Sequence, residues 1–294
     1  TNTATFTLGQ NNNFTVTIAP GAYPVPVPAN WSAAGLPAWA TFNTTTHVLS
    51  GTPPSGSITG SPYAVTFTVT NTAGTSTQNF NLVVQKGPQT IAWTQALPTA
   101  FGSTYTVTPV SNNGAGQPTG LTVTVTATGA CTIAGNVVSY NNGLGTCTLT
   151  ASQPGDASYN AATNVVRTVQ VQPAPTTTTI TSSVNPSVGG QNVIFTVRVT
   201  TASGAIPTGT VTISSCELYL ILCLNNQTWG TYPLVNGVAI VNKADLPVAH
   251  PGGYIVPQRI TATYNPTGNF GGSNDTLEQT VNTANTAVAL TSTI

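Results

Sequence analysis

The side chains that could do acid–base or nucleophilic chemistry are few and widely spaced. Five acidic residues and two histidines occur among 294 residues. They are Asp156, Glu217, Asp245, Asp275, Glu278, His47 and His250. Acid–base catalysis needs at least two positioned titratable groups, and only Asp275 and Glu278 are close in sequence, where a Gly-Gly-Ser-Asn turn favours a solvated Asp275. Because no GxSxG, HExxH or phosphate-loop motif is present, the sequence predicts no catalytic residue, no metal site, no cofactor and no enzymatic activity.

The four cysteines form two close pairs along the chain. Three connectivities are open to four cysteines, and we expect Cys131–Cys147 and Cys216–Cys223, because each pair then stays inside one predicted domain. Four reduced, buried thiols are the alternative. Disulfides are typical of secreted proteins, and the absence of a CxxC spacing argues against zinc.

Two kinds of feature could involve carbohydrate. Asn-x-Ser/Thr sequons are candidate glycosylation sites, although many arise by chance in a chain so rich in Asn and Thr. They occur at Asn13, Asn30, Asn43, Asn226 and Asn274. Aromatic rings are the other feature: we expect Trp39 and Trp93 in the cores, whereas Trp31 and Trp229 follow polar stretches and are candidates for a carbohydrate platform.

Charge is almost absent from the chain. Lys and Arg number 5, Asp and Glu number 5, and charged residues make up 3% of the sequence, against roughly 25% in an ordinary soluble domain. Five cations cannot line a groove for nucleic acid. No apolar run approaches the roughly 18–20 residues of a membrane span. The chain starts at Thr1, so we expect a processed mature form or a piece of a longer protein.

Alternation with a period of two residues dominates the sequence. Residues 63–70 read YAVTFTVT, residues 121–128 read LTVTVTAT, and Gly and Pro cluster between such runs. This pattern is typical of strands with one buried and one wet face, joined by turns. The predicted fold is all-β, with three tandem immunoglobulin-like β-sandwich domains in an elongated row. The expected domains are 1–85, 86–172 and 173–285, followed by a separate strand at 286–294.

Three segments carry a resemblance to bacterial Ig-like repeats. Residues 1–85 resemble the Ig-like repeats of large bacterial secreted and surface proteins, through GLPAWATF at 35–42 and LSGTP at 49–53. Residues 86–172 resemble a second bacterial Ig-like type, through QTI, CTIAGN, GTCTLTA and YNAA. Residues 176–281 resemble a third type, through TSSVNPS, GQ, PTGTVT, LVNGVA and TATY. The resemblance implies Ig-like sandwiches, and such repeats serve as spacers, adhesins and fibre subunits alike.

One departure from the first family concerns calcium. Its cadherin-like relatives bind calcium through acidic residues, whereas residues 1–85 contain neither Asp nor Glu. Since a calcium ion needs six or more oxygen ligands, usually including carboxylates, we expect no calcium site in this segment.

Two apolar segments could mediate assembly. Between Cys216 and Cys223 the sequence reads ELYLIL, which is either a buried insertion or an apolar knob closed by a disulfide and marking a protein contact. Residues 286–294 (TAVALTSTI) repeat the pattern of residues 176–184 (TTTTITSSV). They are either a truncated further repeat or a strand that completes a sandwich in a neighbouring subunit. The candidate assembly contacts are Leu218, Leu220, Leu222, Val288 and Leu290.

Together these observations favour a non-enzymatic, extracellular structural protein that forms a subunit or segment of a microbial surface fibre. When sheet faces that carry hydroxyl and amide groups pack together, little free energy is spent on removing water from charges. A net charge near zero also favours association. The expected partners are copies of the chain or neighbouring repeats, with glycans as a further candidate. An adhesin for a glycan or host protein, or a passive spacer in a giant surface protein, are the alternatives.

Overall fold

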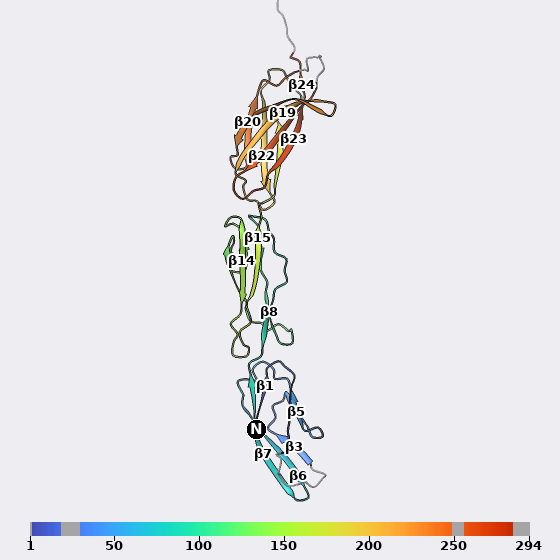
Figure 1. Cartoon of the computed structure of the whole chain (residues 1–294), viewed down its shortest axis with the longest axis vertical. Coiled ribbons are helices and arrows are strands. Elements are labelled where there is room, and N and C mark those ends of the chain that lie inside the picture. The colour runs from blue at the N-terminus through green and yellow to red at the C-terminus, as the bar shows by residue number, and fades with distance from the viewer. Residues whose placement is uncertain (1, 19–29, 249–255, 285–294) are drawn as a thin grey trace, which may run out of the picture. The chain divides into compact units, whose positions relative to one another are not determined.

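The computed structural model describes residues 2–18, 30–248 and 256–284 (Figure 1). Over these residues the chain forms strands and no helix, which confirms the all-β prediction. Two compact units share the chain. The first contains Thr1–Ala96, Val107–Thr126 and Leu149–Arg167, and the second contains Leu97–Thr106, Ala127–Thr148 and Thr168–Ile294. The domain boundaries expected from the sequence remain a prediction.

In the first unit, the strands within residues 3–18 and 30–85 form a two-sheet sandwich. One sheet has the order β1 (Thr3–Thr7), β7 (Gly74–Gln85), β6 (Tyr63–Asn71) and β3 (Asn30–Ala34). The other has the order β2 (Asn12–Thr15), β5 (Val48–Gly51) and β4 (Ala40–Asn43). The buried core contains Ala4, Phe6, Ala40, Leu49, Val65, Phe67, Phe80 and Leu82. Each fully buried aliphatic or phenyl group contributes roughly 1.5–3 kcal/mol to the free energy of unfolding. The alternating pattern of β6 places Val65 and Phe67 in this core, where they help to hold the two sheets together.

The first unit also contains a strand pair and a second apolar cluster. Strand β8 (Gln89–Ala92) pairs antiparallel with β10 (Val110–Asn113). Leu8, Val84 and Tyr159 form a buried cluster against which Leu121 packs. The strand expected from residue 121 begins instead at Thr124 in β11 (Thr124–Gly129). Leu121 follows Gly120, whose φ of 76° breaks the extended backbone.

The middle of the chain forms two three-stranded sheets. Strands β11, β14 (Gly145–Ser152) and β15 (Val165–Val171) have residues in both units and lie in the order β11-β14-β15. In the second unit, β12 (Thr132–Ala134), β13 (Val137–Ser139) and β9 (Thr104–Thr106) form a sheet in that order.

The second unit contains a further sandwich, formed by strands within residues 176–248 and 256–282. One sheet has the order β16 (Thr176–Ser182), β18 (Val193–Thr201) and β21 (Val238–Lys243). The other has the order β20 (Leu222–Pro233), β19 (Gly209–Tyr219), β22 (Gln258–Pro266) and β23 (Ser273–Gln279). A short parallel pair, β17 (Ser187–Val188) and β24 (Val281–Asn282), completes it.

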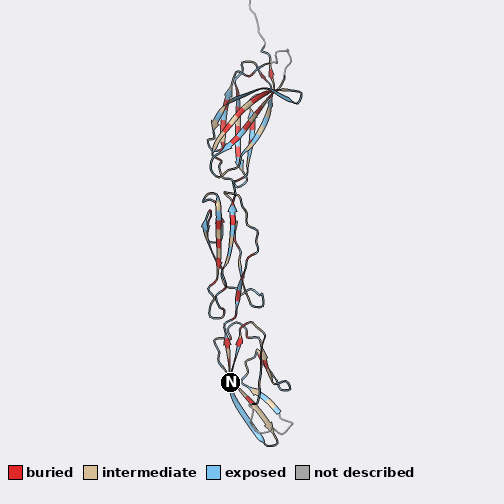
Figure 2. Ribbon diagram, in the orientation of Figure 1, coloured by how far each residue is buried: buried red, intermediate tan, exposed pale blue. Residues whose placement is uncertain are grey.

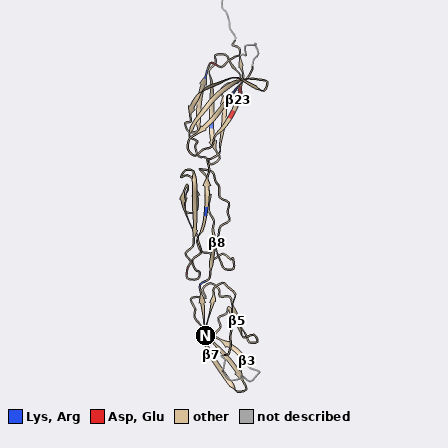
Figure 3. Cartoon of the chain, in the orientation of Figure 1, with Lys and Arg blue, Asp and Glu red and all other residues tan. Residues whose placement is uncertain are grey.

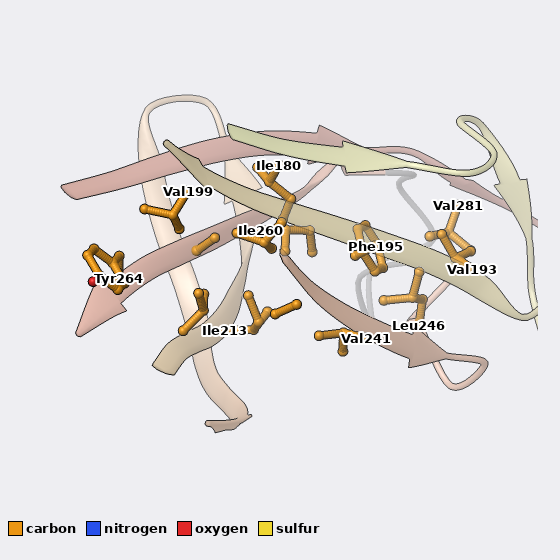
Figure 4. Close-up of a cluster of buried hydrophobic side chains, with 14 residues drawn as sticks. Ile180, Val193, Phe195, Val199, Ile213, Val241, Leu246, Ile260, Tyr264 and Val281 are labelled. Carbon is orange, nitrogen blue, oxygen red and sulfur yellow. The ribbon is translucent and has the colours of Figure 1, made fainter. Parts of the chain in front are cut away.

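The core of this sandwich lies between its two sheets (Figure 4). Phe195 and Val241 project from one sheet toward Ile213 and Ile260 of the other, and all four side chains are at most 1% exposed. Along strands such as β22, buried residues alternate with more exposed ones (Figure 2). The alternating sequence pattern therefore produces sandwiches with hydroxyl-rich outer faces.

Candidate interaction sites

Two carboxylates of the described residues make structural contacts. Glu217 is buried, and its Oε2 accepts a hydrogen bond from Asn225 Nδ2 at 2.9 Å. Asp156 Oδ1 accepts the backbone N–H groups of Ser158 and Tyr159, each at 2.7 Å, and so shapes a turn.

Charged residues are sparse along the described part of the chain (Figure 3). Lys243 Nζ lies 2.9 Å from Asp245 Oδ1, and its hydrogen bond to this carboxylate lowers the pKa of Asp245. Arg259 and Glu278 form a looser pair at 3.6 Å. Among the described residues there is no group of three or more His, Cys, Asp or Glu side chains that could hold a metal ion. His250 lies outside the described residues.

Asp275, which the sequence predicts to be solvated, is half-buried and joins the two sheets of the second sandwich. Its Oδ2 accepts the backbone N–H of Ile180 at 2.9 Å, linking β23 to β16. Ser273 Oγ lies 2.7 Å from the hydroxyls of both Thr176 and Thr178. Ser182 Oγ donates to Gln279 Oε1 at 2.7 Å. These contacts form the β16–β23 seam, in which side chains rather than a backbone ladder connect the sheets.

Trp31 keeps features of a binding platform. Its indole is half-buried and stacks on the imidazole of His47, with ring centroids 4.2 Å apart and an interplanar angle of 27°. His47 occupies a turn with a φ of 58°, which holds its ring against β3. The pair presents an aromatic surface that is partly open to solvent.

Trp229 does not fit the expected platform. It packs against the core of the second sandwich, with its ring centroid 5.4 Å from that of Phe195. Its Nε1 donates to Ser215 Oγ at 2.8 Å, and Lys243 Nζ lies 5.3 Å from the ring centroid. Trp93 is buried and Trp39 packs against the first core, as expected.

Both expected disulfides are present. Cys131 joins Cys147 with Cα atoms 5.3 Å apart, and both residues are buried. Cys216 joins Cys223 across the β19–β20 hairpin, also with Cα atoms 5.3 Å apart. Here Cys216 is buried and Cys223 is exposed.

The apolar segment enclosed by the second disulfide is an exposed knob and not a buried insertion. We call residues 218–224 the hairpin tip. Leu220, Ile221 and Leu222 are 82%, 89% and 58% exposed, whereas Leu218 is half-buried. The sequence prediction missed Ile221, because it picked alternate residues as if on one strand face. Ile221 could have been found from its position midway between the two cysteines, because a two-residue hairpin turn expected there exposes two adjacent side chains. Val288 and Leu290 lie outside the described residues.

The five sequon asparagines, Asn13, Asn30, Asn43, Asn226 and Asn274, are all exposed. Their side chains are therefore accessible to a glycosylation enzyme, and glycan attachment remains a prediction. The second unit also has an open cavity of about 510 Å³ around Phe101 and Pro175, whose lining contains no titratable side chain. No helix among the described residues is long and apolar enough to cross a membrane.

Comparison with solved structures gives distant likenesses. An endo-fucoidan hydrolase, MfFcnA4 of glycoside hydrolase family 107, matches at 12% identity and a TM-score of 0.28, over 94% of this chain and 42% of that chain. Titin domains A168–A170 match at 12% identity and a TM-score of 0.31, over 94% and 95% of the two chains. Drosophila N-cadherin EC1-3 matches at 12% and a TM-score of 0.32, over 97% and 98%. Such low scores do not bear on function.

Comparison with protein families identifies one segment. No curated protein matches the chain. Residues 1–85 match the family described as "Putative Ig domain", and these residues form the first two-sheet sandwich. Residues 1–85 therefore match an Ig-domain family, within a chain that is all-β over the residues that the structure describes.

Proposed function

We propose that the chain is a non-enzymatic, extracellular structural protein, a subunit or segment of a microbial surface fibre that assembles through its Ig-like domains. The observation that carries this proposal is the sparsely charged, hydroxyl-rich outer face of its sheets. In β7, the residues from Gly74 to Asn79 are exposed on both faces of the strand, and none of them is charged. The two disulfides support an oxidising, extracellular location.

The exposed hydroxyls are partly paired within the sheets. Thr70 and Thr75 lie 3.0 Å apart through their Oγ1 atoms, and Thr212 and Thr231 lie 3.2 Å apart. Because these groups already have partners, covering them with another uncharged face leaves few unsatisfied donors or acceptors. Charge repulsion between copies is also minimal at a net charge of +0.

The segment at 286–294 is proposed to supply a strand to another sandwich. Aligned with β16, its Val288 and Leu290 correspond to Thr178 and Ile180, which are 4% and 5% exposed. The neighbouring Ala287 and Ala289 correspond to exposed positions of β16. The segment thus carries the inward and outward pattern of a first strand, which a sandwich in a neighbouring copy could accept.

Electron microscopy of the purified chain tests the fibre. We expect concentration-dependent fibres that disappear on deleting residues 286–294 and in the V288N/L290N variant. The matched A287N/A289N variant changes outward positions only and should still form fibres. Fibres that persist in V288N/L290N would contradict strand exchange, and a wild-type chain that stays monomeric at all concentrations would contradict the fibre itself.

A second candidate is an adhesin for glycans, supported by the half-exposed Trp31–His47 stack. Aromatic rings that keep one side open to water suit the apolar face of a sugar. Glycan-array binding that is lost in W31A and kept in W39F would support this function. A chain that binds no glycan and forms no fibre would point to a passive spacer.

A further inference from the structure

We propose that the hairpin tip inserts into the surface of a lipid bilayer and attaches the protein to a membrane. This goes beyond the fibre function, because it assigns the chain a binding site for lipid. The argument rests on how the tip projects, where its apolar side chains lie and what its turn contains.

The hairpin tip extends past the rest of its sheet. Strand β19 pairs with β22 only as far as Glu217, which lies opposite Gln258. Beyond that point, β19 has β20 as its neighbour in the sheet, with Leu218 opposite Cys223 and Tyr219 opposite Leu222. On β20, the residues from Leu222 to Thr228 are all exposed. Over the described residues the tip is thus a two-stranded ribbon, and its residues other than Leu218 are all exposed.

Apolar groups surround this ribbon. Tyr219, Leu222 and Leu224 share one face by strand alternation, and their exposed fractions are 46%, 58% and 36%. Leu218 and the disulfide sulfur of Cys223 belong to the other face. Leu220 and Ile221 occupy the end. A flat protein surface could cover one face of this ribbon, whereas a fluid bilayer can surround it.

The tip carries no charge that a bilayer would have to desolvate. No charged residue occurs from Leu218 to Trp229. The nearest acid, Glu217, is buried and hydrogen-bonded to Asn225 below the tip. Backbone groups of the ribbon pair across the hairpin, and Leu218 also donates its N–H to Pro257 O at 2.9 Å. Paired backbone is the condition for entry into a hydrocarbon environment.

The turn itself retains large apolar side chains where small residues would fit better. Leu220 has a φ of 55°, in the left-handed region that favours Gly and Asn. The next hairpin of the same sandwich uses Asn236 and Gly237 at such positions, with φ values of 52° and 76°. The same sandwich therefore uses the usual turn residues elsewhere. The Leu220–Ile221 turn instead combines an unfavourable φ at Leu220 with two almost fully exposed apolar side chains.

The size of the tip favours lipid over a second copy of the chain. A stable protein interface uses about 20–30 residues on each side, whereas the tip spans residues 218–224. Insertion into a bilayer has no such requirement, because lipid tails close around each side chain. With no cation in the tip, binding should depend little on anionic lipid or on salt.

Flotation with phosphatidylcholine vesicles tests the proposal, with the full chain at low and high salt. We expect wild type to float with the vesicles, and L220S/I221S to bind at least ten-fold more weakly with an unchanged melting temperature. The control variant V235S/I240S changes two exposed apolar residues elsewhere, 68% and 62% exposed, and should bind like wild type. Vesicles containing phosphatidylserine should give the same affinities.

Three outcomes would overturn the inference. They are a wild-type chain that binds neither kind of vesicle, a tip variant that binds as well as wild type, and a control variant that loses binding equally. If L220S/I221S abolishes fibres or self-association while vesicle binding is unchanged, the tip is a contact between copies. Fibres that survive in the tip variant separate the lipid site from the proposed fibre function.

Discussion

Asp275 Oδ2 accepts the backbone N–H of Ile180 at 2.9 Å, although the two residues are 95 positions apart. Ile180 lies on β16 and Asp275 on β23, which belong to different sheets of the second sandwich. The carboxylate therefore closes the β16–β23 seam at a point where no backbone ladder joins the strands. The nearby contacts of Ser273 and Gln279 extend the same seam in both directions.

Replacing Asp275 by Ala should destabilise the second sandwich by about 1–3 kcal/mol, because the N–H of Ile180 loses its acceptor. Urea unfolding monitored by circular dichroism measures the change. Asp245→Ala is the matched control: this carboxylate is exposed and pairs with Lys243, so its loss should change the free energy of unfolding very little. Equal unfolding midpoints for D275A and wild type would contradict a stabilising role of this hydrogen bond.

Stability should vary little between about pH 4 and 9, because few groups titrate there. Burial raises the pKa of Tyr264, whose OH donates to Thr208 O at 2.6 Å. A raised folded-state pKa means that its contribution is complete below about pH 10 and is lost as the pH rises further. Asp245 acts in the opposite sense, since its lowered pKa gives a contribution that is lost only as the pH falls below about 4.

Thermal unfolding scans across pH test this behaviour. We expect a plateau, a drop in melting temperature on the alkaline side, and a smaller drop in Y264F, which has no phenol to ionise. The variant should also be slightly less stable at neutral pH, since Thr208 loses a donor. A sharp fall in stability near pH 6 would be incompatible with the composition of this chain.

A buried polar network around Gln89 should be sensitive to single substitutions. Ser111 Oγ donates to Gln89 Oε1 at 2.6 Å, and Gln89 Nε2 donates to Gln153 Oε1 at 2.6 Å. Q89A leaves Ser111 and Gln153 without these partners in a buried position, which costs about 1–3 kcal/mol or more. The control variant Q170A replaces an exposed residue and should have little effect on stability. Chemical unfolding of both variants compares them, and similar midpoints would contradict the prediction.

The two disulfides should differ in accessibility to reductant. Cys131 and Cys147 are 3% and 0% exposed, whereas Cys223 is exposed at the hairpin. Under native conditions dithiothreitol should therefore open Cys216–Cys223 first, as read by alkylation and mass spectrometry. Removing the first disulfide in C131S/C147S should lower stability by about 3 kcal/mol in the chain-entropy model. Simultaneous alkylation of all four cysteines would contradict this order.

Local alternation was enough to predict much of the fold. In YAVTFTVT, the positions of Val65 and Phe67 are buried as the pattern indicates, and Ala64 lies outward. The side-chain period of a strand needs only neighbouring residues to be recognised. The pairing of cysteines inside the predicted segments 86–172 and 173–285 followed from the same organisation. The family match covers the remaining predicted segment, residues 1–85.

Contacts that depend on long-range register could not be predicted. Strand β19 has irregularities between Ile213 and Ser214 and between Ser215 and Glu217. Such bulges re-aim the side chains of a hairpin, and Trp229 on the partner strand packs against the core despite its polar approach. Similarly, no local pattern indicates that Asp275 meets Ile180, because their contact arises only when two sheets close on each other.

The parallel pairing of β1 with β7 has a mechanical consequence. Thr3 to Thr7 lie opposite Asn81 to Gln85, so the first and last strands of the Ig domain run side by side in the same direction. Tension applied to the two ends of this domain would slide the strands along each other. Their hydrogen bonds would then share the load in shear and break together, whereas a hairpin pulled from its open end is unzipped one pair at a time.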